Sequence, residues 1–229
     1  MAINKSNTSP AMKAVLIFLI IAFVLGFVSI GTMSLFSNSG STSTTGASST
    51  ATDTVSAINA QYQPTVAAIT QSLQSSPESY TALVNLGNTY FDWAAQIQQA
   101  SQANTSAVGA DQPLWTSAKD AYARAVAVNN KESSVRTDYA ITLFYTGDTT
   151  KAVEIVTAVT KDDPKFPYGW FNLGIFKKAL GDNKTALGAF QKAIELDPKG
   201  AKISIDYAKQ QVTELKSAPA SSTPSPSAP

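Results

Sequence analysis

The stretch Gly169–Pro198 reads GWFNLGIFKKALGDNKTALGAFQKAIELDP. Its apolar and small residues recur at steps of three and four, first over residues 170–174 and again over residues 186–193. Such steps return to the same side of an α-helix. Between the two runs, Gly181 can adopt a positive φ and end the first helix, while Asp182 can cap the second. The closing proline stops the second helix. The stretch therefore predicts an antiparallel helical hairpin.

A single hairpin of this kind leaves one apolar face uncovered, so we expect neighbouring copies of it along the chain. A shift of 34 residues towards the N-terminus finds one. Seven positions keep their character under this shift: Leu173 with Tyr139, Gly174 with Ala140, Gly181 with Gly147, Ala186 with Ala152, Phe190 with Val156, Ala193 with Val159, and Pro198 with Pro164. A common register over seven positions predicts a stacked array of helical hairpins.

These positions resemble the tetratricopeptide repeat, whose 34-residue unit carries W-x2-L-G-x2-Y, then A-x3-F-x2-A and a final proline. Residues 167–200 match this pattern except at Lys177, where the family has Tyr. Residues 133–166 match less closely, with Arg136 in place of Trp. A further unit is expected at 80–132, interrupted by an insertion at 95–113. The resemblance implies an all-α solenoid of about three repeats plus capping helices, the last of them at 201–216.

The resemblance also implies which residues pack the repeats together. Small residues let the helix axes approach, and larger apolar residues fill the space around them. The positions expected to pack the repeats are Leu86, Gly87, Tyr90, Ala118, Tyr122, Ala125, Gly147, Ala152, Trp170, Leu173, Gly174, Gly181, Ala186, Phe190, Ala193 and Pro198.

In the family that this chain resembles, the first helix of each hairpin lines a concave groove that binds a protein or peptide partner. The corresponding positions are Asn88, Phe91, Asp92, Thr137, Ile141, Phe144, Tyr145, Tyr168, Phe171, Asn172, Ile175 and Lys178, with Val84 and Asp138 in the same register. Aromatic anchors are common in surfaces that recognise peptides or helices. The alternative is that these aromatic residues pack against the adjoining repeat.

One form of the family is disfavoured by the residues at these positions. Members that clamp a C-terminal carboxylate place Lys, Asn and Arg in the groove. Here Val84, Asp138 and Tyr168 occupy places where that clamp needs Lys or Asn. Binding of a chaperone's C-terminal tail is therefore not expected.

Composition excludes several kinds of chemistry. The chain of 229 residues contains no Cys and no His, so it has no disulfide, thiol nucleophile, imidazole base or Cys/His zinc site. Its net charge is +1 without a basic cluster, which gives no footprint for nucleic acid. The sequence has neither a phosphate-binding loop nor a nucleophile elbow. We expect no enzyme activity, no cofactor and no metal site.

Residues 14–36 form an uncharged run of 23 residues, AVLIFLIIAFVLGFVSIGTMSLF. As a helix this run would span about 34 Å, enough to cross a bilayer's hydrocarbon core. It is longer than the apolar region of a cleaved signal peptide, so it predicts an uncleaved signal-anchor. Lys5 and Lys13 precede it and no charge follows it before Asp53. The N-terminal tail 1–13 is therefore expected in the cytoplasm of a bacterium, with the repeats outside the cell membrane.

Composition also divides the remainder of the chain. Residues 37–53 consist almost entirely of Ser, Thr, Gly, Ala and Asn and predict a flexible linker. Residues 54–216 form the predicted repeat domain, in which Ser76 and Pro77 are expected to begin a helix. Residues 217–229 are rich in Pro and Ser and predict a disordered tail.

Together these features predict a membrane-tethered scaffold that binds a protein or peptide partner without catalysis. Two alternatives stay open. One is an assembly factor of an envelope pathway such as cytochrome c maturation, which rests on analogy of fold alone. The other is a structural subunit that self-associates into a homo-oligomer through its repeats and its span. Gly26 and Gly31 are not in G-x-x-x-G spacing, which disfavours the membrane part of that alternative.

Overall fold

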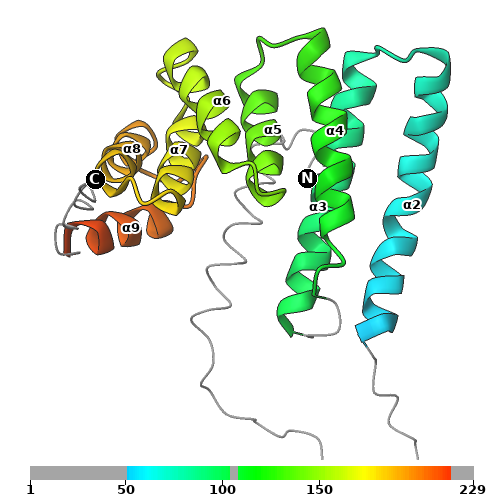
Figure 1. Cartoon of the computed structure of the whole chain (residues 1–229), viewed down its shortest axis with the longest axis horizontal. Coiled ribbons are helices and arrows are strands. Elements are labelled where there is room, and N and C mark those ends of the chain that lie inside the picture. The colour runs from blue at the N-terminus through cyan, green and yellow to red at the C-terminus, as the bar shows by residue number, and fades with distance from the viewer. Residues whose placement is uncertain (1–50, 104–107, 218–229) are drawn as a thin grey trace, which may run out of the picture. The chain divides into compact units, whose positions relative to one another are not determined.

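The computed structural model describes residues 51–103 and 108–217, and every regular element in these ranges is an α-helix. Figure 1 shows how the helices follow one another as hairpins. The predicted cytoplasmic tail, the span at 14–36, the linker up to residue 50 and the C-terminal tail from residue 218 lie outside the described residues. Among the helices that the structure describes, none is both long and apolar enough to cross a membrane.

The described residues divide into two compact units, one before and one after the boundary between Val128 and Asn129. The N-terminal unit contains α2 (Ala51–Ser75), α3 (Tyr80–Ala103) and α4 (Gln112–Val128). The three helices lie side by side, and α3 packs against both of the others (Figure 1). The predicted insertion at 95–113 corresponds to the last turns of α3, the connection to α4 and the first two residues of α4.

Helix α2 continues through Pro64. A proline inside a helix removes one backbone hydrogen bond and crowds the preceding turn. Contacts with α3 close to Pro64 hold α2 in place. The Trp93 Nε1 atom donates to Asn59 Oδ1 over 2.9 Å, and the ring of Tyr62 stacks on that of Trp93 with centroids 5.7 Å apart. These tertiary contacts therefore outweigh the tendency of proline to interrupt a helix.

Helix α3 begins at Tyr80, later than the predicted start at Ser76 and Pro77. Residues 76–79 instead form a turn in which the backbone N–H of Ser79 donates to the carbonyl of Ser76. Ser79 then accepts the backbone N–H of Ala82 with its hydroxyl, at a long distance of 3.4 Å. The helix starts one turn later than predicted because Ser76 and Pro77 belong to the turn that connects α2 to α3.

The C-terminal unit contains two hairpins and a final helix. The first hairpin comprises α5 (Ser133–Tyr145) and α6 (Thr149–Asp162), and the second comprises α7 (Pro167–Ala179) and α8 (Asn183–Leu196). Helix α7 packs against α5 and α6 as well as α8, and α9 (Ile205–Ser217) packs against α8. This arrangement stacks the two hairpins and covers the outer one with α9.

The two turns of these hairpins are alike, as their common register predicts. Gly147 and Gly181 have φ values of 91° and 76°, in the left-handed region that favours glycine. The residue after each glycine caps the next helix. The Asp148 carboxylate accepts from the backbone N–H of Lys151, and the Asp182 carboxylate accepts from that of Thr185, each over 3.2 Å.

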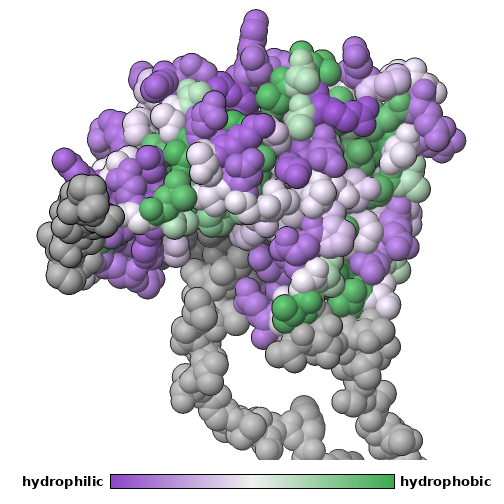
Figure 2. Space-filling model, in the orientation of Figure 1, coloured by the Kyte–Doolittle hydropathy of each residue, from purple (hydrophilic) through white to green (hydrophobic). Residues whose placement is uncertain are grey.

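Most residues expected to pack the repeats are buried. The buried members are Leu86, Gly87, Ala118, Tyr122, Ala125, Ala152, Leu173, Gly174, Ala186, Phe190 and Ala193. Tyr90 and Trp170 are only half-buried, and the indole of Trp170 donates to the carbonyl of Pro164. Gly147, Gly181 and Pro198 are exposed because they form or follow turns. Figure 2 shows one face, on which hydrophobic residues form small separate patches among hydrophilic ones.

Helix α9 starts at Ile205, four residues after the predicted start of the capping helix. The residues before it are held in a loop by the buried carboxylate of Asp197. This carboxylate accepts the backbone N–H groups of Ala201, Lys202 and Ile203 at 2.9, 2.6 and 3.0 Å. Since these three donors are satisfied in the loop, the helix begins beyond them.

Candidate functional site

In the N-terminal unit, the predicted groove positions of α3 contact the two neighbouring helices. Phe91 is buried, and its ring meets the edge of Trp115 of α4 with centroids 5.0 Å apart. The Tyr122 hydroxyl of α4 donates to Asn88 Oδ1 over 2.6 Å. Asp92 is half-buried, and its negative charge adds to burial in raising the pKa of Tyr62 to about 12. Asn88 and Phe91 therefore help to join α3 to α4.

The sequence analysis did not single out the aromatic cluster that joins α2 to α3. Trp93 stacks with Tyr62 and also with Tyr90, whose ring centroid lies 6.1 Å away at an interplanar angle of 7°. Trp93 lies three residues after Tyr90, one turn further along α3, in a position that the repeat pattern does not specify. The signal that could have found it is the pair of aromatic residues one helical turn apart.

In the C-terminal unit, six predicted groove residues are buried. They are Thr137 and Ile141 on α5, and Tyr168, Phe171, Asn172 and Ile175 on α7. Phe171 lies between the outer helices of the unit, because its ring contacts Phe190 of α8 and Tyr207 of α9 at centroid distances of 6.0 and 5.8 Å. Phe171 thus packs as the alternative interpretation of the aromatic residues expects.

Phe144 and Tyr145, at the end of α5, keep part of their surface exposed. The ring of Phe144 stacks on Phe176 of α7, with centroids 4.9 Å apart, and meets the ring of Tyr145 nearly at a right angle. These contacts anchor Phe144 to α7. The ring of Tyr145 contacts that of Phe144, and both side chains are partly exposed.

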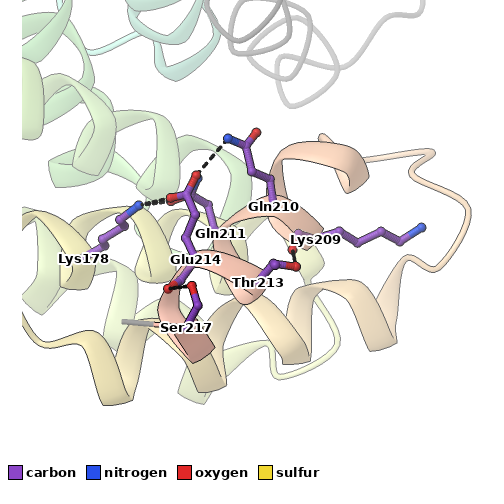
Figure 3. Close-up of polar contacts among 7 residues, drawn as sticks. All are labelled: Lys178, Lys209, Gln210, Gln211, Thr213, Glu214 and Ser217. Atoms are coloured by element: carbon purple, nitrogen blue, oxygen red, sulfur yellow. Dashed lines mark hydrogen bonds and ion pairs between the residues drawn. The ribbon is translucent and has the colours of Figure 1, made fainter. Parts of the chain in front are cut away.

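Lys178, the last predicted groove residue, is engaged by α9 (Figure 3). Its Nζ atom lies 2.8 Å from Glu214 Oε2 and also donates to Gln211 Oε1. The hydrogen bond from Lys178 lowers the pKa of Glu214, and a second one from Gln210 adds to this effect. A partner that used Lys178 would compete with these contacts.

A buried polar group lies where α5 meets α7. We call Asp138, Tyr168 and Asn172 the acceptor cluster; their exposed fractions are 2%, 1% and 0%. The Asn172 Nδ2 atom donates to the backbone carbonyl of Tyr168 over 2.9 Å. The Tyr168 hydroxyl lies beside Asp138 and Asn172. Burial, followed by the charge of Asp138, raises the pKa of Tyr168 well above its usual value.

Metal ligands are not gathered anywhere in residues 51–103 and 108–217. No group of three or more acidic side chains in these ranges is arranged to hold a metal ion. The predicted residues that lie where α5 meets α7 comprise two partly exposed aromatic residues, Phe144 and Tyr145, and the buried cluster of Asp138, Tyr168 and Asn172. We call these five residues the α5–α7 face.

Comparison with protein families gives a match in the outer hairpin of the C-terminal unit. Residues 167–199 match the tetratricopeptide repeat family. This segment contains α7, α8 and the turn between them. The family match therefore covers the stretch 169–198, from which the sequence predicts the hairpin. No curated protein sequence matches the chain.

Among solved structures, the chain is similar in fold to several tetratricopeptide proteins. YrrB, a protein described as having an unusual peptide-binding site, is 21% identical, with 68% of this chain and 87% of YrrB covered at a TM-score of 0.40. The Sgt2 tetratricopeptide domain of Aspergillus fumigatus is 22% identical, with coverages of 59% and 90% and a TM-score of 0.42. TTC0263 of Thermus thermophilus is 14% identical, with coverages of 69% and 91% and a TM-score of 0.45.

We call residues 167–199 the tetratricopeptide segment. This segment and the hairpin before it have the same turn geometry. The glycine turns at 147 and 181 are 34 residues apart, as are the aspartate caps at 148 and 182. Position 174 of the segment lies against Phe190, and the equivalent position 87 in the N-terminal unit lies against Tyr122. A glycine facing an aromatic ring of the second helix is thus common to the segment and to the hairpin of α3 and α4.

Proposed function

We propose that the protein is a membrane-tethered tetratricopeptide scaffold that binds a protein or peptide partner and is not catalytic. The observation that carries this proposal is the match of residues 167–199 to the tetratricopeptide repeat, with an adjoining hairpin in the same register. Tetratricopeptide arrays are quasi-one-dimensional stacks whose extended surfaces serve binding. We further propose that residues 133–166 and 80–132 are repeats of the same kind.

The α5–α7 face is the proposed binding surface of the C-terminal unit. Phe144 and Tyr145 provide partly exposed aromatic rings there, and rings of this kind often dominate binding energy at interfaces. Burial of the other predicted aromatic residues narrows the proposal to this pair. Lys178 lies outside the proposed surface because α9 already engages it.

Replacement of Tyr145 by Ala is expected to weaken partner binding by roughly 1–4 kcal/mol, because it removes an aromatic anchor from the proposed surface. The partner is first identified by crosslinking in membranes, and its affinity for purified full-length variants is then measured by calorimetry. Lys192→Ala is the matched control, since Lys192 lies on α8 and pairs with Glu195 of the same helix. Unchanged affinity of a folded Tyr145→Ala variant would rule out this surface.

The membrane tether is proposed from residues 14–36, with Lys5 and Lys13 on the cytoplasmic side. Protease added to spheroplasts should then degrade the tetratricopeptide segment, while an N-terminal tag stays protected. The mature protein should retain its own N-terminus. Protection of the segment in intact spheroplasts, with degradation only after lysis, would contradict this topology. A mature N-terminus beyond residue 36 would contradict the anchor itself.

A further inference from the structure

Helix α2 exposes a long side that carries no charge. Most of residues 54–75 are exposed, and none of them is acidic or basic. The exposed sides of α6, α8 and α9 do carry charges, among them Lys151, Lys184 and Lys209. Exposed helix faces of globular proteins usually carry charged residues, whereas the centres of protein interfaces are depleted of them. The exposed side of α2 therefore shares its lack of charge with protein interfaces.

Helix α2 lies at the edge of the N-terminal unit (Figure 1). Among the described residues, α3 is the helix against which it packs extensively. Its inward side holds Leu73, which is buried, and Tyr62, whose ring stacks on Trp93 of α3. The other side of α2 has no charged group that would lose its water on contact, so a further helix can pack there without that cost.

The outer side of α2 has the spacing of a seam between two helices. Ala57, Ala60, Pro64, Ala67 and Gln71 follow one another at steps of three and four, and all of them are exposed. Alternating steps of three and four keep residues facing the partner helix in a parallel pair. We call these residues the outer seam. Because α3 occupies the other side of α2, the outer seam has no helical partner within the described residues.

A second copy of the chain is the partner that best suits an uncharged seam. In a twofold dimer, a residue near the axis faces the same residue of the other copy. Any charge near the axis would therefore meet an identical charge, which strongly disfavours the contact. The outer seam of α2 avoids this repulsion along its whole length, since residues 54–75 contain no charge.

The position of α2 in the chain favours the same partner. The proposed membrane span ends at residue 36, and residues 37–50 separate it from α2. A flexible linker of this length has an average reach of about 20 Å. Two copies anchored in one membrane would therefore hold the N-terminal ends of both α2 helices close to it, at a raised local concentration. This favours a parallel pair over an antiparallel one.

We infer that the outer seam of α2 is a homodimer interface, in which the α2 helices of two membrane-anchored copies pack in parallel about a twofold axis. The inference rests on the membrane tether of the proposed function. It goes beyond that function because it assigns a second surface, on a different helix from those of the α5–α7 face. A dimer of this kind carries two α5–α7 faces, so a partner with two binding segments would be held more tightly.

Single-cysteine variants test the interface directly, because the chain contains no Cys of its own. Ala60→Cys and Ala67→Cys are made in the full-length protein, and membranes that contain each variant are oxidised with copper phenanthroline. In a parallel pair each seam residue lies opposite its own copy, so both variants should form disulfide-linked dimers. The two positions lie about 10 Å apart along the helix, so an antiparallel pair can place only one of them on its axis. Linking at one position alone would overturn the parallel arrangement.

Thr65→Cys is the matched control for cysteine linking, since Thr65 is an exposed residue of α2 on the flank of the seam. It should link at least about fivefold more slowly than the seam variants, because a disulfide requires Cα atoms within about 7 Å of each other. Equal linking at position 65 and in the seam would indicate random collision in the membrane and would overturn the interface.

Ala67→Arg places a charge in the seam opposite its own copy. The dimer dissociation constant of the full-length protein, measured by sedimentation equilibrium in detergent, should rise at least about tenfold. Ala127→Arg is the matched control, since Ala127 is an exposed alanine on α4, and it should leave the constant unchanged. Equal constants for Ala67→Arg and the wild type would show that another part of the chain forms the dimer, and would overturn the role of α2.

The outcomes separate this inference from the proposed function. Anchored protein that does not link at positions 60 and 67 would overturn the inference and leave the tether standing. Absence of the chain from membranes would contradict the tether and, with it, the parallel arrangement. Partner binding at the α5–α7 face is measured independently with the Tyr145→Ala variant, so its failure would leave the dimer standing.

Discussion

Gly174→Leu should lower the free energy of unfolding by about 3 kcal/mol, through overpacking where α7 meets α8. A Cβ atom at position 174 would lie 2.9 Å from three ring atoms of Phe190, closer than carbon atoms approach without displacement. Phe190 cannot turn aside freely, because it is fully buried and contacts Phe171 and Tyr207. The larger leucine side chain must therefore push the two helices apart.

Urea unfolding of the full-length protein in detergent, followed by far-UV circular dichroism, measures this effect. Gly188→Ala is the matched control: Gly188 lies inside α8, and a Cβ atom there would meet nothing within 4 Å. This control should raise stability by up to about 1 kcal/mol, because glycine is a poor helix former. Equal stability of Gly174→Leu and the wild type would show that position 174 is not a close helix contact.

Asp197→Ala should lower the free energy of unfolding by about 3 kcal/mol, since hydrogen bonds to charged groups contribute more than neutral ones. The Asp197 carboxylate is 7% exposed and accepts three successive backbone N–H groups. Alanine would leave these donors without their acceptor. The loop would then no longer hold Ile203, which is 1% exposed, in its buried position before α9.

Hydrogen exchange resolves where this loss occurs. The amides of residues 201–203 and of α9 should lose protection first, while those of α5 and α6 should change only as far as global stability falls. Asp197→Asn keeps one acceptor oxygen and should cost less than the alanine variant. If Asp197→Ala unfolds at the wild-type urea concentration with unchanged protection at residues 201–203, the carboxylate does not organise this loop.

Local features of the outer hairpin were predictable because they depend on residues close in sequence. The positive φ of Gly181 and the cap at Asp182 follow from the backbone freedom of glycine and the reach of an aspartate side chain. Their recurrence at Gly147 and Asp148 predicts the second hairpin. The span, linker and tail predicted from composition lie at the two ends of the chain, outside the described residues, and stay predictions.

The start of α3 and the course of α2 were not predictable from the same local rules. Pro64 lies inside α2 because Asn59 and Tyr62 are held by Trp93, which is 34 residues away from Asn59. A local preference of a few kcal/mol is outweighed when several tertiary contacts act on the same turn. Which contacts these are depends on the packing of α2 on α3.

In the candidate site too, some features follow from the local sequence and others only from tertiary packing. The amino-acid sequence by itself determined the hairpins and their register, since helix periodicity, turn glycines and capping aspartates act over a few residues. It also determined which side of each helix carries Asp138, Tyr145 and Tyr168. Only the tertiary structure decided that Phe171 is covered by Tyr207 and that Lys178 is engaged by Glu214, because both contacts come from the placement of α9. Burial of a side chain depends on neighbours distant in sequence, which is why the same face holds both partly exposed rings and a buried carboxylate.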